Sequence, residues 1–319
     1  MPIISYDSNI HLDIKVISQW LNEYRYNLNT YNNYRNIAHY FIVWLIEHNL
    51  SVKSITRTTI HNYQDYLIDF LKNSTINLHI TVLGSMFQYL INIQYIYVNP
   101  FRLRKQKLPV KKKLTKYLTI SDWEILLNFI DNPQTKKEYR SRWIFLLLYY
   151  TGCRRSEVVN AKMIDVTIKR TGWWITVAGK GNKTGSIPMP NILIVEFIKY
   201  RNSLSLPDIP QVNETNPLIS SISDPLLSIT ASTLYRIIKK TTRKLSEQLK
   251  EHDPVRAQIF KDFSPHWLRH TSATHQFEYG IDLRTIKENL RHSNIQTTLS
   301  YSHLDQDKQH SETVEKFGN

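Results

Sequence analysis

Apolar residues recur at helical spacing through the first hundred residues of this chain. Ile17, Trp20 and Leu21 follow the three- and four-residue steps that place side chains on one face of a helix. The same steps return three more times before Asn99-Pro100, where the proline ring cannot continue a helix. The pattern therefore predicts a small domain of four helices within residues 1–100, with most of its aromatic side chains in the core.

The remainder of the chain mixes helical and strand patterns. Helical spacing predicts helices over about residues 121–131, 141–150, 232–250, 266–279 and 283–289. Trp173–Val177 and Ser186–Met189 are short β-like runs on either side of a glycine-containing turn, which predicts a hairpin. A capping box of Ser121 and Glu124 is predicted to begin the first of these helices. We expect a mainly α-helical fold with a small antiparallel β-sheet in the second domain.

A basic segment separates the two patterns. The chain carries 41 Lys and Arg against 27 Asp and Glu, for a net charge of +14. Residues 101–116 hold eight of the basic side chains and no acidic one: Arg102, Arg104, Lys105, Lys107, Lys111, Lys112, Lys113 and Lys116. Because like charges repel one another and resist burial, this segment, the basic linker, is predicted to connect a domain over 1–100 to one over 117–319. It is either a solvated connection or a strap that lies along a polyanion such as DNA.

Several classes of protein are excluded by what the sequence lacks. No apolar run approaches the ~20 residues of a membrane span, and the N-terminus has no signal-peptide pattern. The one cysteine, Cys153, allows no disulfide framework within the chain, so we expect a cytoplasmic protein. His266 and His270 have a spacing that could suit a metal, but the segment lacks a metalloprotease glutamate and the chain lacks a cysteine pair. No GxxxxGK[ST] nucleotide loop occurs either, and we expect no cofactor.

Four short motifs in the second domain carry candidate chemistry. They are Thr151–Glu157, Gly179–Lys183, His266–His270 and Leu290–Ser293, and a tyrosine, Tyr301, follows the last of them. Each motif alone is weak, because a single arginine, lysine or tyrosine is most often a surface or packing residue. In this order and at this spacing, the motifs resemble those of the tyrosine recombinase (phage integrase) family.

The resemblance covers nearly the whole chain. It implies that residues 1–100 are a core-binding (SAM-like) DNA-binding domain and residues 117–319 the catalytic domain, which together form a two-domain DNA clamp. It also implies a site-specific recombinase that acts on double-stranded DNA sites, as a tetramer on two sites. The catalytic residues implied are Arg154, Lys180, His266, Arg269, His292 and Tyr301, with Glu157 in support. One departure is Arg291, at a position where the family usually has glycine.

The chemistry of DNA strand cleavage explains this choice of residue types. Arg154 and Arg269 offer planar, permanently charged donors to a phosphate whose transition state gathers negative charge. A tyrosine has a pKa near 10, so Tyr301 must lose its proton as it attacks, and His266 is a suitable acceptor. Lys180, in the hairpin turn, can protonate the departing 5′ oxygen.

The two remaining groups have accessory roles under the same resemblance. His292 is expected to hydrogen-bond a phosphate oxygen, and Glu157 to orient Arg154 or a neighbouring base. The 3′-phosphotyrosyl intermediate that the family forms stores the energy of the broken bond, so rejoining needs neither ATP nor a metal.

Two other functions remain open from the residues alone. A type IB topoisomerase-like enzyme would use the same residue types to nick and reseal one strand as a monomer. A DNA-binding protein that has lost catalysis is the third reading, although all the matched catalytic positions are filled. The helical first domain and the amino-acid sequences of the motifs favour the recombinase.

Overall fold

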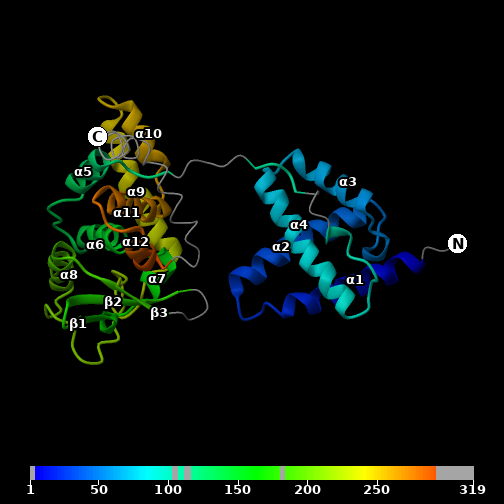
Figure 1. Cartoon of the computed structure of the whole chain (residues 1–319), viewed down its shortest axis with the longest axis horizontal. Helices are drawn as coiled ribbons and strands as arrows, with labels where there is room; N and C mark the ends of the chain where they lie inside the picture. Colours follow the sequence, from blue (N-terminus) through cyan, green and yellow to red (C-terminus); the bar gives the residue numbers. More distant parts are fainter. Residues whose placement is uncertain (1–3, 103–106, 111–115, 180–183, 292–319) are drawn as a thin grey trace, which may run out of the picture. The chain divides into compact units, whose positions relative to one another are not determined.

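The computed structural model describes residues 4–102, 107–110, 116–179 and 184–291. The chain forms two compact units, Met1–Lys113 and Leu114–Asn319, here called the N-terminal and C-terminal units (Figure 1). No helix in the described ranges is both long and apolar enough to cross a membrane.

The N-terminal unit is helical, as its sequence predicts. Its four α-helices are α1 (Ile4–Asn22), α2 (Leu28–Glu47), α3 (Arg57–Ile68) and α4 (Asn73–Asn92). Capping fixes where two of them begin: Asn27 accepts a hydrogen bond from the Thr30 amide at α2, and Thr56 accepts one from the Thr59 amide at α3. Of the aromatic side chains at core spacing, Trp20, Phe41 and Tyr63 are buried, whereas Tyr40, Tyr66 and Phe70 are exposed. The buried rings pack against one another, as those of Phe41 and Tyr63 do with their centroids 5.0 Å apart.

Part of the basic linker lies against the N-terminal unit. The side chain of Asn77, on α4, donates to the carbonyl of Leu108 and accepts from its amide, each at 2.8 Å. Asn73, one turn earlier, donates to the carbonyl of Pro109 at 2.9 Å. Residues 107–110 are therefore held by α4, which differs from a linker that is solvated along its whole length. The reason is that the two asparagine amides replace the water that the extended backbone would otherwise bind.

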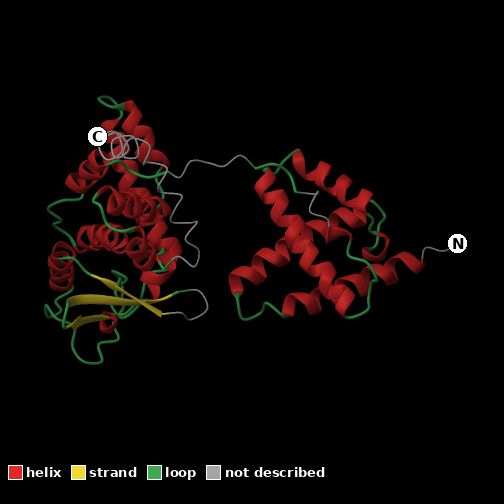
Figure 2. Ribbon diagram, in the orientation of Figure 1, coloured by secondary structure: helices red, strands yellow, loops and turns green. Residues whose placement is uncertain are grey.

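The C-terminal unit is mainly helical with one small sheet (Figure 2). Its helices are α5 (Ile120–Phe129), α6 (Lys136–Thr151), α7 (Arg155–Asn160), α8 (Asn191–Ser203), α9 (Ala231–Leu249), α10 (Pro254–Asp262), α11 (Pro265–Glu278) and α12 (Leu283–Leu290). The strands β1 (Val166–Lys169), β2 (Gly172–Ala178) and β3 (Thr184–Pro188) form an antiparallel sheet in that order. The predicted hairpin is β2–β3, with Ile175 opposite Ile187 and Val177 opposite Gly185. The mainly α fold with a small antiparallel sheet is confirmed.

Helix α6 is the centre of this unit. Residues Ile144–Leu148 are buried around the whole circumference of the helix, which is why its sequence shows an unbroken apolar run. It packs against α8, α9 and α11. The indole of Trp143 donates to the carbonyl of Leu218 at 3.1 Å, so even its polar atom has a partner inside the core.

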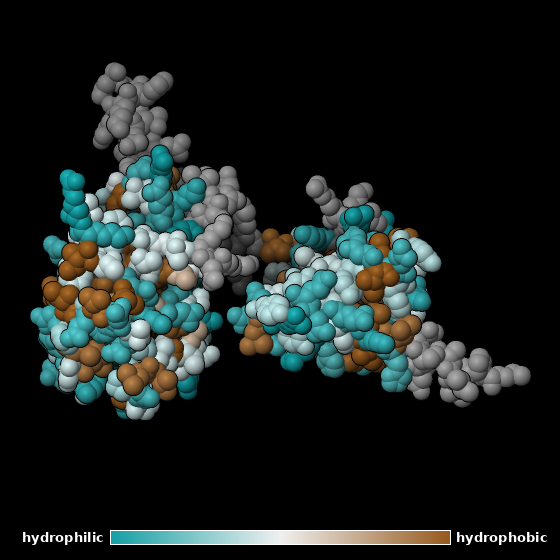
Figure 3. All heavy atoms as spheres, turned by 90° about the horizontal axis from the view of Figure 1, so that it is seen from below, coloured by the Kyte–Doolittle hydropathy of each residue, from teal (hydrophilic) through white to brown (hydrophobic). Residues whose placement is uncertain are grey.

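On the face that Figure 3 shows, apolar residues form small, separate patches among hydrophilic ones.

The predicted start of α5 was wrong by two residues. Thr119, rather than Ser121, is the N-cap, and Asp122, rather than Glu124, completes the capping box. Both pairs fit the sequence signature, and a distant contact decides between them. The Asp122 carboxylate is buried and accepts a hydrogen bond from Arg256 of α10 at 2.9 Å. That ion pair fixes Asp122 in the first turn of the helix.

Candidate active site

The end of α6 is shaped by a glycine. Gly152 has φ +58, the left-handed conformation that closes a helix, and its amide donates to the carbonyl of Leu148 at 3.0 Å. A Cβ at this position would lie 2.4 Å from Cδ2 of Leu290, at the end of α12. Glycine is therefore needed twice, for the backbone conformation and for the close approach of α12. The turn directs the chain at once into Cys153 and Arg154.

Arg154 and Glu157 form a closed pair at the start of α7. The backbone amide of Arg154 donates to Oε2 of Glu157 at 2.7 Å, and its Nη1 donates to Oε1 at 2.9 Å. The Glu157 side chain is 3% exposed, whereas that of Arg154 is 47% exposed. The carboxylate thus holds the guanidinium from the protein side and leaves its outer edge accessible to an anion.

Arg269, on α11, is the second arginine of the predicted site. It is buried, and its Nη1 donates to the carbonyl of Gly152 while its Nη2 donates to the carbonyl of Leu290. Residue 269 is 117 positions from Gly152 along the chain, so this one side chain joins the ends of α6 and α12 to α11. Its orientation is fixed before any ligand binds.

His266 lies one helical turn before Arg269. Pro265 occupies the first position of α11, where its missing N–H is not needed. Burial lowers the pKa of His266, and the positive charges of Arg269 and Arg154 lower it further. The imidazole is therefore neutral near pH 7 and able to accept a proton.

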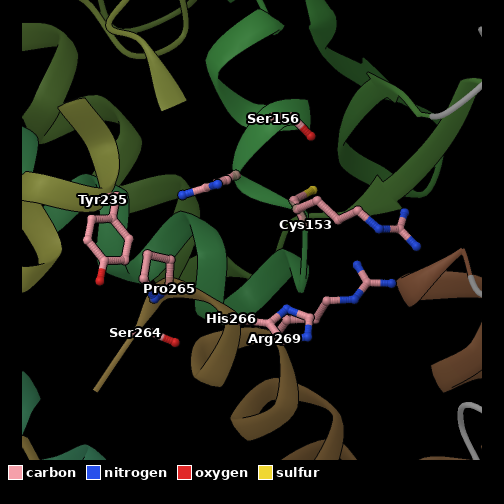
Figure 4. A pocket seen from close by; sticks show the side chains of 9 residues that line it. Cys153, Ser156, Tyr235, Ser264, Pro265, His266 and Arg269 are labelled. Carbon is pink, nitrogen blue, oxygen red and sulfur yellow. The ribbon is translucent and has the colours of Figure 1, made fainter. Parts of the chain in front are cut away.

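These side chains meet in one pocket of about 400 Å³ (Figure 4). Its lining includes Cys153, Arg154, Tyr235, Ser264, His266 and Arg269, from α7, α9 and α11 and the residues next to them. The sequence predicted three of these residues, and the structure brings all three together. The two guanidinium groups around this cavity suit the binding of an anion. The neutral imidazole beside them can take a proton from a group that reacts with the anion.

Three predicted catalytic residues, Lys180, His292 and Tyr301, lie outside the described residues. The structure does describe the segments that lead to two of them. Gly179 follows β2, one residue before Lys180. Arg291 ends α12, one residue before His292. A Cβ on Gly185 of β3 would lie 2.3 Å from Cδ of Arg291, so the hairpin and the end of α12 are in contact.

The basic linker residues have different surroundings. Lys107 and Arg102 are exposed. Lys116 pairs with Asp262 at 3.6 Å, and its Nζ lies 5.2 Å from the ring centroid of Trp267, next to His266. The others, Arg104, Lys105, Lys111, Lys112 and Lys113, lie outside the described residues.

A second basic surface on α9 was missed in the sequence. Its exposed members are Arg236, Lys240, Arg243 and Lys244. Tyr235, on the same helix, lines the pocket, whereas the four basic residues do not. The signal that could have found it is the stretch between Asp224 and Glu247, which contains five Lys and Arg and no acidic residue. It was overlooked because these charges are spread over a helical pattern instead of forming one run.

Known proteins are similar to this chain over most of its length. The model of the phage integrase family matches residues 116–308. The tyrosine recombinase XerC of Staphylococcus saprophyticus is 29% identical over 287 residues, which cover 88% of each chain. A tyrosine recombinase of Thermosipho africanus is 29% identical over 238 residues, or 74% of each chain.

Solved structures show the same fold. The XerH site-specific recombinase, in a post-cleavage complex with a palindromic difH substrate, is similar with a TM-score of 0.72 and 20% identity over 93% of this chain and 83% of that one. The Tn1549 transposon integrase in complex with transposon right end DNA is similar with a TM-score of 0.70 and 18% identity, over 95% of this chain and 99% of that one.

Proposed function

Because the chain belongs to the phage integrase family, we propose that Tyr301 attacks a DNA phosphate held in the pocket of Arg154, His266 and Arg269. The chain is a tyrosine recombinase, an enzyme that cleaves and rejoins DNA strands in site-specific recombination. The observation that carries the assignment of residues is the pocket itself. Two motifs that are far apart in the sequence supply its guanidinium groups and its neutral imidazole.

The described residues suit the first chemical step. Arg269 is held by two backbone carbonyls and Arg154 by a buried carboxylate, so both charges are oriented before the phosphate arrives. The phenolic oxygen of Tyr301 forms a bond to phosphorus while the bond to the 5′ oxygen breaks. His266 accepts the phenolic proton, and Lys180 supplies a proton to the 5′ oxygen. His292 donates a hydrogen bond to a phosphate oxygen.

Rejoining reverses these transfers with a 5′ hydroxyl from another strand as the nucleophile. The 3′-phosphotyrosyl bond is broken, the phosphodiester is formed again, and Tyr301 recovers its proton. Because no bond energy is lost to water, the cycle needs no external energy source. We further propose that residues 1–100 bind the DNA core site, that the basic linker contacts phosphates, and that four protomers assemble on two sites.

A suicide substrate, whose cleaved strand carries too few nucleotides to be rejoined, tests the assignment of the nucleophile. Wild-type protein is expected to form a denaturant-resistant adduct with this DNA. Tyr301→Phe should bind the DNA with nearly unchanged affinity, because phosphate contacts elsewhere dominate binding, and should form no adduct. Tyr279→Phe, which alters an exposed tyrosine after α11, is the matched control and should form the adduct normally.

Each other outcome has a definite meaning. An adduct with Tyr301→Phe would reject Tyr301 as the nucleophile, and DNA binding by the wild type without any adduct would make the chain an inactive binding protein. Strand exchange between two duplexes, analysed by gel electrophoresis, separates a recombinase from an enzyme that only nicks and reseals one strand.

A further inference from the structure

We propose that Arg291 is a positioning residue for strand cleavage, which acts by clamping the Glu157 carboxylate that holds Arg154. The inference rests on the proposed function, because it concerns the orientation of a phosphate-binding guanidinium. It is carried by three observations at the end of α12: an unusual backbone, a tightly enclosed side chain and a shared carboxylate.

The backbone of Arg291 has a conformation that arginine rarely adopts. It caps α12 with φ 53 and ψ 45, in the left-handed region that favours glycine. Five other non-glycine residues in the described ranges have positive φ, and all of them are exposed: Asn49, Gln94, Asn132, Ser205 and Asn213. Arg291 differs because its side chain is only 14% exposed. A strained conformation that persists at a buried position needs contacts that hold it there.

The side chain lies in a space that only glycine leaves open. A Cβ on Gly185 of β3 would lie 2.3 Å from Cδ of Arg291 and 3.1 Å from Cγ. The guanidinium reaches past this strand to the Glu157 carboxylate, with which Nη2 forms an ion pair, and Nη2 is 3.7 Å from Sγ of Cys153. Its Nε and Nη1 are buried and have no hydrogen-bond partner within the described part of the chain, so the ion pair with Glu157 is the main polar contact of this guanidinium.

Glu157 is consequently held by two arginines. Oε1 accepts from Nη1 of Arg154 at 2.9 Å, and Oε2 accepts both the Arg154 amide at 2.7 Å and Nη2 of Arg291. A carboxylate fixed through both oxygens cannot rotate about its last bond, so it offers Arg154 one orientation. Without Arg291, Oε2 keeps the Arg154 amide but loses its charged partner, so Glu157 and the guanidinium that it holds are fixed less tightly.

The test measures the rate of adduct formation under saturating suicide substrate, together with the Kd for DNA. Arg291→Gln should slow the adduct about 10- to 100-fold, a loss typical of a misplaced catalytic group, and leave Kd nearly unchanged. Arg291→Gly should be equally slow although it relieves the backbone, and Arg291→Lys should recover part of the rate. Arg284→Gln is the control, because Arg284 is on the same helix and pairs with Glu288, but is 86% exposed.

A double-mutant cycle shows whether the effect passes through Glu157. In a Glu157→Gln background, Arg291→Gln should change the rate by no more than about twofold, because the carboxylate it clamps is gone. Thermal unfolding of every variant shows whether the proteins whose rates are compared are folded. If Arg291→Gln does not fold, Arg291→Gly is used for the same measurement.

Three results would overturn the inference: an unchanged rate in both Arg291→Gln and Arg291→Gly, a loss confined to Kd, or an equal loss with and without the Glu157 carboxylate. Failure of the proposed function is a different result, since the wild type itself would then form no adduct.

Discussion

At the residue scale, the imidazole of His266 lies where burial and two guanidinium groups act in the same direction. All three influences lower its pKa, because each disfavours the protonated form. At neutral pH the ring is therefore uncharged. In the proposed mechanism it accepts the proton of the attacking tyrosine, and it adds no third positive charge to the pocket.

The rate of adduct formation should depend on pH through this group. Because the pKa is lowered, His266 stays neutral until the pH falls below the ordinary histidine value of about 6.5. The rate should fall on the acid side of that value, as protonation removes the acceptor, and should stay high near pH 7. His266→Gln should lose this acid limb and react about 10²–10⁴-fold more slowly.

Rates measured from pH 5 to 8 at saturating DNA would check this, with binding measured at each pH as the control. A midpoint above the ordinary histidine value, or an acid limb that persists in His266→Gln, would assign the titration to another group.

Single residues also show what the sequence could and could not reveal about the site. That Arg154, His266 and Arg269 line one pocket agrees with the sequence prediction, which rested on short motifs of residue types that suit phosphate chemistry. The contact between Arg291 and Glu157 could not be predicted, since 134 residues separate the two positions. It depends on a left-handed helix cap, which the usual glycine of the family at this position signals, and on the space above Gly185, which leaves no pattern in the sequence.

At the element scale, the junction of α6 and α12 depends on a single glycine. Gly152→Ala should destabilise the C-terminal unit for two reasons: the positive φ and the Cβ that would overlap Leu290. Gly280→Ala isolates the first reason, because Gly280 also has positive φ (+78) but no described atom lies within 4 Å of the position that its Cβ would take. Overpacking typically adds about 1–3 kcal/mol, so Gly152→Ala should lose that much more free energy of unfolding than Gly280→Ala. Equal losses in denaturant titrations would mean that α12 moves aside without cost.

Elements were easier to predict where one face is buried and the helix is long. The helices of the N-terminal unit and the β2–β3 hairpin follow their hydrophobic patterns, and the start of α5 does not. Thr119 and Ser121 have equivalent capping signatures, and only the pairing of Asp122 with Arg256 of α10 selects the first. Short elements such as β1, with four residues, offer too few positions for a periodic pattern.

At the scale of the whole molecule, positive charge is placed in two separate segments. The basic linker carries +8 of the net +14, and the exposed face of α9 carries a second group. DNA binding through phosphates makes affinity depend on salt, because each neutralised phosphate releases counterions. Charge that merely keeps a protein soluble has no such effect on the salt dependence of binding.

The salt dependence of DNA affinity should therefore report on α9. Replacing Lys240, Arg243 and Lys244 with Ala removes three exposed charges, and each phosphate contact contributes roughly −0.9 to the slope of log affinity against log salt. The slope should flatten by up to about 2–3 units, with similar losses on cognate and random DNA.

Replacing Lys111, Lys112 and Lys113 of the basic linker should flatten the slope in the same way, and the effects of the two sets of substitutions should add. The control replaces Lys169 and Arg170, two exposed basic residues at the end of β1 and not on α9. An unchanged slope in the α9 variant would make that surface a solvated face, and a loss confined to cognate DNA would make it a reader of base sequence.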